Sequence, residues 1–435
     1  MTSVPEASGA TPALPGPLPP GGPATAAGRP EALAPRSWIA RMTLASVGLW
    51  AGFFGPIQVL LALQAAELTP SHKEATLGLV TGLGAAVSTV GNPLAGAFSD
   101  RTTSRLGRRL PWVVGGALTG VLAMVVLAFA HSVALVALGW CLAQAGLNAM
   151  LAALTAAVPD LVPERQRGLV SGWLGVAQTL GIVMGTGVAA AVGGIRAGYL
   201  ALAVLVGVTA LPYVLRSLDQ RLDPAARPEV SVREFLRGFW ISPSRHPDFG
   251  WAWATRFLVN VSNALGTLYL LFYLSDAVGV AKPDEAVFVL TVLYAVGLVA
   301  TTVVAGAWSD RLGQRRVFVV VSGAIMAAAA GILAVWPTWP GAITGALVLG
   351  AGFGVYASVD FALITQVLPT EGDHARDLGV INIANALPQV LAPALAAPIV
   401  RAFADRSDGY RALYGVAAVV GLVGALLVRR IRSVR

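Results

Sequence analysis

Two charged side chains lie inside long apolar stretches of this sequence, and they are its strongest candidates for chemistry. Arg256 lies about seven residues into the apolar run 249–274, and Asp360 about eight residues before the end of the run 342–368. At 1.5 Å per helical residue, both would sit roughly 10–12 Å from the same membrane boundary. Charged groups at membrane depth are costly and usually functional. We predict that they form an ion pair beside a substrate site, with Asp360 able to take up a proton; the alternative is a static pair that only holds two helices in register.

Amide side chains form a second group of candidates. An amide can donate and accept, so it can bond several hydroxyl groups of a polar solute. Asn260 lies one turn beyond Arg256, on the same predicted helix face. The alternative role is hydrogen bonding between membrane helices. The candidate amides are Gln58, Gln144, Asn148, Asn260, Asn263, Asn382 and Asn385. Trp50 could stack on a ring, although aromatics in a span more often pack or face lipid.

The elements that carry these residues must be membrane helices. The chain of 435 residues is 56% hydrophobic and only 12% charged, about half the charge of a soluble domain. Backbone groups in lipid must bond within their own segment, so apolar runs of about 20 residues are helices. The sequence predicts an all-α protein with twelve spans. They cover residues 44–63, 77–98, 110–129, 133–158, 169–192, 197–215, 249–274, 286–308, 317–336, 342–368, 378–400 and 413–428.

The basic residues predict the orientation of these spans. Of the 30 Arg and Lys, 23 fall on one side if both termini share it, six fall on the other, and Arg256 lies within a span. The positive-inside rule then places both termini in the cytoplasm of a multi-pass inner-membrane protein. The net charge of +8 lies in short loops and not in one basic domain, which argues against nucleic acid as a partner.

The chain divides into two halves of six spans. We expect a disordered cytoplasmic tail over residues 1–40, a six-helix bundle over 41–215, a linker over 216–248, a second bundle over 249–430 and a basic tail over 431–435. Within the linker, a capping box and apolar residues at helical spacing predict a short amphipathic helix on the cytoplasmic surface; the alternative is a linker helix that packs against the protein.

A repeated motif relates the two halves. Residues 95–101 read Ala-Gly-Ala-Phe-Ser-Asp-Arg, and residues 305–311 read Ala-Gly-Ala-Trp-Ser-Asp-Arg, 210 positions later. Each copy ends an even-numbered span and opens a basic loop. The first copy comprises Gly96, Asp100, Arg101, Gly107, Arg108 and Arg109, and the second comprises Gly306, Asp310, Arg311, Gly313, Arg315 and Arg316. A duplicated half of six spans is typical of transporters that rock about a central site.

This motif resembles the loop 2–3 signature of the major facilitator superfamily. The longer form over residues 99–112 is similar to the sucrose/proton and glycoside–pentoside–hexuronide symporter branches. The resemblance implies two pseudo-symmetric bundles, with spans 1, 4, 7 and 10 lining a cavity. It implies that Asp100 and Asp310 latch the halves in an outward-facing state by pairing with arginines and a helix N-terminus; the alternative is a topology anchor. Span 1 carries Gln58 and Gln64 where known sucrose symporters carry an acid.

The resemblance leads to an expected function. We expect a secondary active transporter of a small glycoside-like solute, coupled to a cation, with H⁺ as the coupling ion and Asp360 as its carrier. The alternative is an exporter of a small metabolite or drug. Exporters of that kind carry Pro after a span 5 Gly, whereas Thr186 follows Gly185 here.

Other classes of protein fit the sequence less well. A membrane enzyme would need a nucleophile, base or metal cluster, and a pump would need a phosphate-binding Gly-rich loop; the sequence offers neither. One cysteine and four scattered histidines predict no disulfide and no metal site. We therefore expect no cofactor, and a monomer whose partners are the solute and the lipid bilayer.

Overall fold

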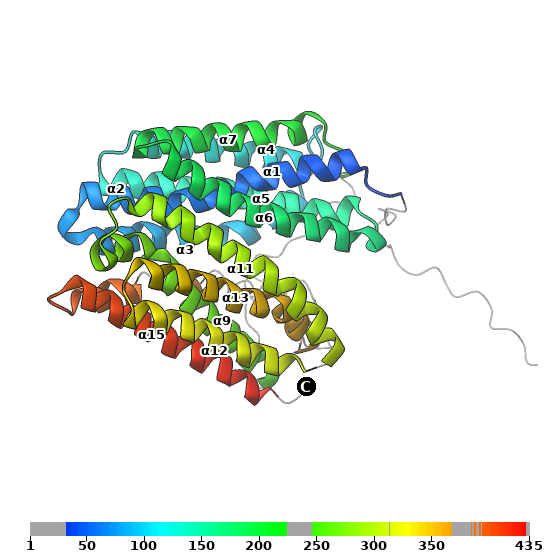
Figure 1. The fold of residues 1–435 in the computed structure, drawn as a ribbon. Coiled ribbons are helices and arrows are strands. Elements are labelled where there is room, and N and C mark those ends of the chain that lie inside the picture. Colours follow the sequence, from blue (N-terminus) through cyan, green and yellow to red (C-terminus); the bar gives the residue numbers. More distant parts are fainter. Residues whose placement is uncertain are drawn as a thin grey trace, which may run out of the picture.

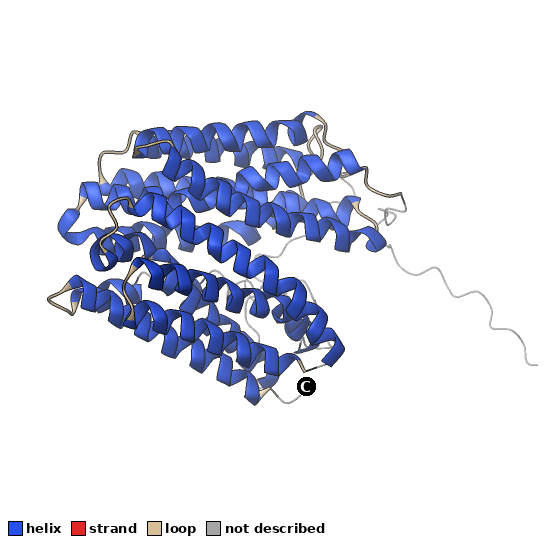
Figure 2. Ribbon diagram, viewed as in Figure 1, coloured by secondary structure: helices blue, strands red, loops and turns tan. Residues whose placement is uncertain are grey.

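The computed structural model describes residues 32–223, 246–312, 314–367 and 394–431, together with residues 384, 387, 388, 391 and 392. Throughout these ranges the regular elements are helices (Figure 2). Ten of the helices described are long and apolar enough to cross a membrane, and a bent pair of helices supplies an eleventh crossing. The predicted span 378–400 lies mostly outside the described residues, although residues 394–401 are helical. The all-α prediction is therefore confirmed.

The N-terminal half contains six crossings. The first is continuous but irregular, because Pro56 lacks a backbone N–H and the chain takes one wide π-helical turn, η1, between two α-helices. The elements are α1 (Arg36–Gly55), η1 (Pro56–Leu60), α2 (Leu61–Leu68), α3 (Lys73–Asp100), α4 (Leu110–Ala128), α5 (Val133–Leu161), α6 (Glu164–Ala191) and α7 (Ile195–Leu215).

The described part of the C-terminal half follows the same order. Its first crossing is bent by 47° near Tyr269, where α9 ends and a short helix and a second π turn follow. The elements are α9 (Pro247–Leu268), α10 (Leu270–Tyr273), η4 (Leu274–Val278), α11 (Pro283–Leu312), α12 (Arg315–Val335), α13 (Trp339–Val367) and α15 (Arg406–Leu427).

The predicted start of the first bundle was wrong by several residues. Helix α1 begins at Arg36, inside the predicted tail of residues 1–40. The chain just before it is docked on α6, where Ala34 N–H donates to Oε1 of Gln166 at 2.8 Å and its carbonyl accepts from Nε2 at 3.0 Å. The polar residues Arg36 and Arg41 concealed this extension, because helical turns outside the hydrocarbon need not be apolar. Residues 1–31 and the predicted linker helix lie outside the described residues.

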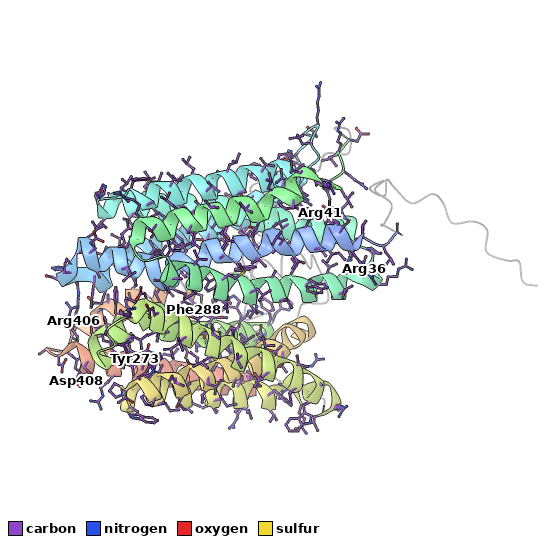
Figure 3. All side chains as sticks on the ribbon, turned by 45° about the horizontal axis from the view of Figure 1, so that its top comes forward. Arg36, Arg41, Tyr273, Phe288, Arg406 and Asp408 are labelled. Atoms are coloured by element: carbon purple, nitrogen blue, oxygen red, sulfur yellow. The ribbon has the colours of Figure 1, made fainter. Side chains whose placement is uncertain are left out.

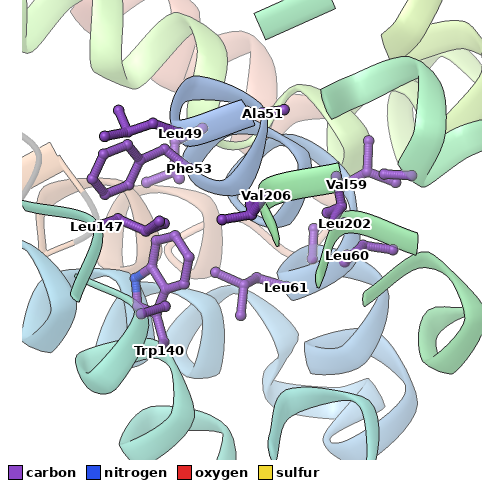
Figure 4. Packing of buried hydrophobic residues seen from close by; sticks show 14 of the residues in the cluster. Leu49, Ala51, Phe53, Val59, Leu60, Leu61, Trp140, Leu147, Leu202 and Val206 are labelled. Atoms are coloured by element: carbon purple, nitrogen blue, oxygen red, sulfur yellow. The ribbon is translucent and has the colours of Figure 1, made fainter. Parts of the chain in front are cut away.

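Small residues let the helices of each half pack closely, as is usual in membranes. A Cβ added to Gly185 on α6 would lie 2.6 Å from the carbonyl oxygen of Ala51 on α1. In the other half, a Cβ on Gly350 of α13 would lie 2.1 Å from the carbonyl oxygen of Tyr294 on α11. Large buried residues then fill the core (Figure 4). Leu147 and Val206 lie against Gly52 of α1, and Trp140 lies against Gly84 of α3.

The two halves lie side by side (Figure 1). We call the end with Asp100 and Arg109 the motif end, and the end with Lys73 and Asp276 the opposite end. The ribbons approach each other near α2 and α10 and separate toward the motif end. Outward-facing apolar side chains are exposed on both halves, as on α11 at Val296, Val299 and Val303. An apolar surface of this extent suits lipid and not water.

Candidate functional site

The predicted charged residues of the C-terminal half lie in contact. Nη1 of Arg256 on α9 lies 2.6 Å from Oδ2 of Asp360 on α13. The second carboxylate oxygen, Oδ1, accepts a hydrogen bond of 2.7 Å from the Tyr356 hydroxyl, one turn earlier on α13. Asp360 is buried, as is Tyr356. One oxygen of this carboxylate therefore forms an ion pair with a guanidinium, and the other accepts a hydrogen bond from a neutral hydroxyl.

Aromatic residues connect this pair to a third helix. The Tyr356 ring lies 5.9 Å from the ring of Phe353, which lies 6.3 Å from the ring of Tyr294 on α11. The Tyr294 hydroxyl is hydrogen-bonded to the side chain of Asn263 on α9. These contacts join α9, α11 and α13 into one polar and aromatic group around the ion pair.

A second polar cluster lies in the N-terminal half, between α3 and α5. Nδ2 of Asn148 donates to Oε1 of Gln144 at 3.0 Å. Oδ1 of Asn148 accepts from the Ser88 hydroxyl at 3.1 Å and from Nδ2 of Asn92 at 3.4 Å. Gln144 and Asn148 are buried. The structure thus brings two predicted amides together and adds Ser88 and Asn92 to them.

The remaining predicted residues are placed separately. Gln58 is half-buried in η1, and η1 contacts α9, α10 and α11 of the other half. Trp50 packs against Phe53 and Phe54. Nδ2 of Asn260 donates to the carbonyl of Arg256 on its own helix. Asn382 and Asn385 lie outside the described residues.

The first copy of the motif forms a charged cluster within the N-terminal half. Arg109 is buried; it pairs with Asp100 and, through Nε at 2.9 Å, with Asp160. Arg108 pairs with Asp160 at 2.5 Å. Carboxylates on both sides raise the pKa of Arg109 and outweigh its burial. In this structure Asp100 therefore contacts its own half, and the latch between halves stays a prediction for another state.

An acid from the chain after α7 completes this cluster. Oδ2 of Asp219 accepts hydrogen bonds from the backbone N–H groups of Arg109, at 2.6 Å, and Leu110, at 2.7 Å. Asp219 thereby caps the N-terminus of α4. Gly107, at φ +107°, permits this approach, because a Cβ there would lie 2.3 Å from Oδ2 of Asp219. Burial raises the pKa of Asp219 despite these hydrogen bonds.

The second copy of the motif is described only in part. Gly313 and the side chain of Asp310 lie outside the described residues. Gly306 belongs to α11, Arg311 is exposed, and Arg315 and Arg316 open α12 half-buried.

Several polar residues of these clusters were missed by sequence reasoning. Tyr356 was within reach, because it lies four residues before Asp360 and therefore on the same helix face. Asp219 gave no signal, because its partners lie more than a hundred residues away in the sequence. Lys73 and Glu74, which contact the other half, looked like ordinary residues of a short loop. In the ranges described, no group of three His, Cys, Asp or Glu could hold a metal ion.

Two packed bundles of membrane helices, each with a buried polar cluster and related by a repeated motif, define a polytopic transporter fold and not an enzyme. The chain belongs to the Major Facilitator Superfamily, a family of membrane transporters, whose profile matches residues 42–291 and 281–435. This match confirms the family that the repeated motif predicted.

Curated relatives agree with this assignment. The chain is 23% identical to the sucrose transport protein SUT3 of Oryza sativa subsp. indica, over 88% of this chain and 92% of that protein. It is 28% identical to the myo-inositol transporter 3C of Cryptococcus neoformans var. grubii, over 39% of this chain. That second match spans 30% of the relative's length.

Solved structures share the fold at low sequence identity. A mutant of the nucleoside transporter NupG matches with a TM-score of 0.73 and 12% identity, over 91% of this chain and 99% of that one. A bacterial homologue of the lysosomal transporter Spinster, in an inward-facing conformation, matches with a TM-score of 0.68 and 13% identity, over 92% of this chain and 96% of that one.

Proposed function

We propose that this protein is a secondary active transporter that moves a small polyhydroxylated solute, a sugar or polyol, together with a proton. The observation that carries the proposal is the Arg256–Asp360 ion pair within a membrane helix bundle, in which Asp360 is buried, Arg256 is half-buried and the Tyr356 hydroxyl bonds the carboxylate. Names of the relatives support the solute class, since they include a sucrose and a myo-inositol transporter.

The chemistry of this group suits proton coupling. When Asp360 is ionised, its negative charge holds Arg256. When a proton binds the carboxylate, the attraction is lost and the guanidinium becomes available to a solute oxygen. Arg256 presents planar, forked donors, which suit neighbouring oxygens of a polyol. A solute and a proton can thus favour the same rearrangement, which is the condition for coupling.

Alternating access is supported by how the halves meet. They approach each other at the opposite end and separate toward the motif end. With the basic loops in the cytoplasm, as the positive-inside rule requires, this arrangement corresponds to an inward-facing state. The amide cluster at Gln144 and Asn148 and the group at Arg256 then belong to different halves. A solute that contacts both would bind differently in each state of the transporter.

The deciding experiment is uptake into proteoliposomes with an imposed pH gradient. The wild-type protein should accumulate a sugar or polyol from a panel that includes sucrose and myo-inositol, and hydrophobic dyes should not compete. In Asp360→Asn, uptake driven by the gradient should fall at least tenfold, because the carboxylate that takes the proton is absent. Solute exchange without a gradient should fall less.

The matched control is Asp408→Asn, which changes an exposed aspartate of α15 that pairs with Arg411. Its uptake should equal that of the wild type. Proton-dependent uptake at the wild-type rate in Asp360→Asn would refute the coupling role of this residue. Export of dyes without uptake of any polyol would refute the proposed solute and direction.

A further inference from the structure

A group of charged and polar residues joins the two halves at the opposite end. Nζ of Lys73, the first residue of α3, lies 2.7 Å from Oδ2 of Asp276 in η4. Its neighbour Glu74 accepts from Nη1 of Arg406 at 2.9 Å and from the Tyr410 hydroxyl at 3.2 Å, both on α15. Lys73 and Glu74 belong to the N-terminal half, and the other three residues to the C-terminal half. We call these five residues the clasp.

The contacts of the clasp are shared among its members. Arg406 also lies 3.7 Å from Oδ2 of Asp276, and the Tyr410 hydroxyl lies 3.5 Å from the same oxygen. The Tyr269 hydroxyl donates to the backbone carbonyl of Glu74 at 3.2 Å. Two cations and two anions therefore balance one another across the interface between the halves.

Glu74 is the member that most depends on the clasp. Its side chain is 2% exposed, whereas that of Arg406 is 40% exposed. A buried carboxylate without a cation is strongly unfavourable, whereas an exposed guanidinium can return to water at little cost. If the halves part at this end, Glu74 must either keep Arg406 or become hydrated. Unpairing or hydrating Glu74 is therefore one cost of separating the halves at this end, beside that of parting Lys73 from Asp276.

The clasp lies where it could block a pathway between the two halves, and not within one half. Figure 3 places Arg406 at the end of the molecule opposite Arg36 and Arg41. Close apolar packing accompanies it, since Phe288 of α11 would lie 2.9 Å from a Cβ added to Gly187 of α6 in the other half. The ribbons separate toward the motif end, so the clasp lies where the halves converge.

We propose that the clasp closes the solute pathway at the opposite end, and that breaking the Glu74–Arg406 contact is the step that opens this end during transport. This inference rests on the proposed transporter function, but its test needs no solute. Removal of Arg406 should shift the protein from the state seen here toward one that is open at the opposite end and closed at the motif end.

Distances between spin labels on purified protein in lipid nanodiscs test this directly. In a Cys141→Ser background, Glu67→Cys and Ala404→Cys report on the opposite end, and Thr103→Cys and Gln314→Cys report on the motif end; all four sites are exposed. In Arg406→Gln, a longer-distance population should appear at the opposite end. A shorter-distance population should appear at the motif end, because the halves rock as units.

Two further variants make the result decisive. Arg411→Gln is the control, because Arg411 lies on the same helix and its described contacts, with Asp408 at 3.4 Å and with the carbonyl of Ala334 at 3.0 Å, are within its own half. This variant should leave both distances unchanged. Glu74→Gln with Arg406→Gln removes the Glu74–Arg406 ion pair without leaving either charge unpaired, and Lys73 still neutralises Asp276; it should shift both distances even if Arg406→Gln alone folds poorly.

Unchanged distances in both Arg406 variants would overturn the proposal. Lengthening at the opposite end without shortening at the motif end would also overturn it, because that result indicates local loosening. If the wild type takes up none of the solutes tested, the proposed function is refuted, whereas the distances still test the role of the clasp.

Discussion

At the scale of single residues, Asp219 shows how a side chain can be essential to a site and invisible in the sequence. Its carboxylate caps α4 through two backbone N–H groups that lie more than a hundred residues earlier in the chain. Arg256 and Asp360 were predictable for the contrary reason. A charged residue within an apolar run is easy to recognise in a sequence. Two such residues of opposite charge, at a similar depth in the membrane, are expected to pair with each other.

Asp219 gives a prediction for the pH dependence of stability. Burial raises its pKa in the folded protein above the value near 4 of an unfolded chain. Its titration therefore favours the folded state most at low pH, and this contribution is lost as the pH rises through the folded value. As the pH rises from about 4 to 7, the melting temperature of the wild type should therefore fall relative to that of Asp219→Asn.

The measurement is a thermal unfolding series in detergent. Asp408→Asn, which changes an exposed acid, provides the baseline for nonspecific effects of charge. A difference that stays constant with pH would show that the backbone hydrogen bonds cancel the effect of burial on the pKa of Asp219. A difference that moves in favour of the wild type would show that they outweigh it.

At the scale of elements, the sequence predicted which segments are helices better than how they pack. Apolar length alone identifies a span, so the helices of both halves were expected. The π turn at Pro56 and the bend near Tyr269 were not predicted, because each depends on how this segment packs against the neighbouring helices. The start of α1 was also missed, since its first turns are amphipathic and lie beyond the apolar run.

The contact between α1 and α6 gives a prediction at this scale. A methyl group in Gly185→Ala would lie 2.6 Å from the Ala51 carbonyl oxygen, so the two helices must separate. Overpacking of this kind costs about 1–3 kcal/mol. Gly175→Ala on the same helix meets nothing within 4 Å and should be neutral or slightly stabilising, because alanine favours helix more than glycine does.

Thermal unfolding of both variants in the same detergent tests this packing. The apparent melting temperature of Gly185→Ala should fall by several degrees relative to Gly175→Ala. Equal melting temperatures would mean that α1 and α6 adjust freely and that the close approach is not a requirement of the fold.

At the scale of the whole molecule, topology is the property that the sequence predicts most directly. The repeated motif and the excess of Arg on one side both follow from positions along the chain, so neither needs the structure. How the two halves meet could not be predicted, because the clasp joins the start of α3 to η4 and α15, which lie far apart in the sequence.

Reporter fusions test the predicted topology. Fusions after Asp100 and after Arg311 should both report a cytoplasmic location, because the basic loops that follow resist translocation. A fusion after Asp408 should report the other side of the membrane. Locations on different faces for the first two fusions would contradict the duplicated architecture.

Two charges of the clasp, those of Glu74 and Arg406, recur like the motif in the other half of the chain. Helices α3 and α11 begin 210 residues apart, at Lys73 and Pro283, and this offset carries Glu74 to Asp284 and Arg406 back to Arg196. The equivalent charges are thus present, yet Arg196 lies over the Phe129 ring of its own half, 4.9 Å from its centre. A protein made of two identical halves would carry two such contacts at this same end of the molecule, one on each side of the pseudo-symmetry axis. Among the residues described, Glu74 and Arg406 form the contact whereas Arg196 packs within its own half, so a single substitution at Arg406 removes an interaction that has no duplicate across the axis.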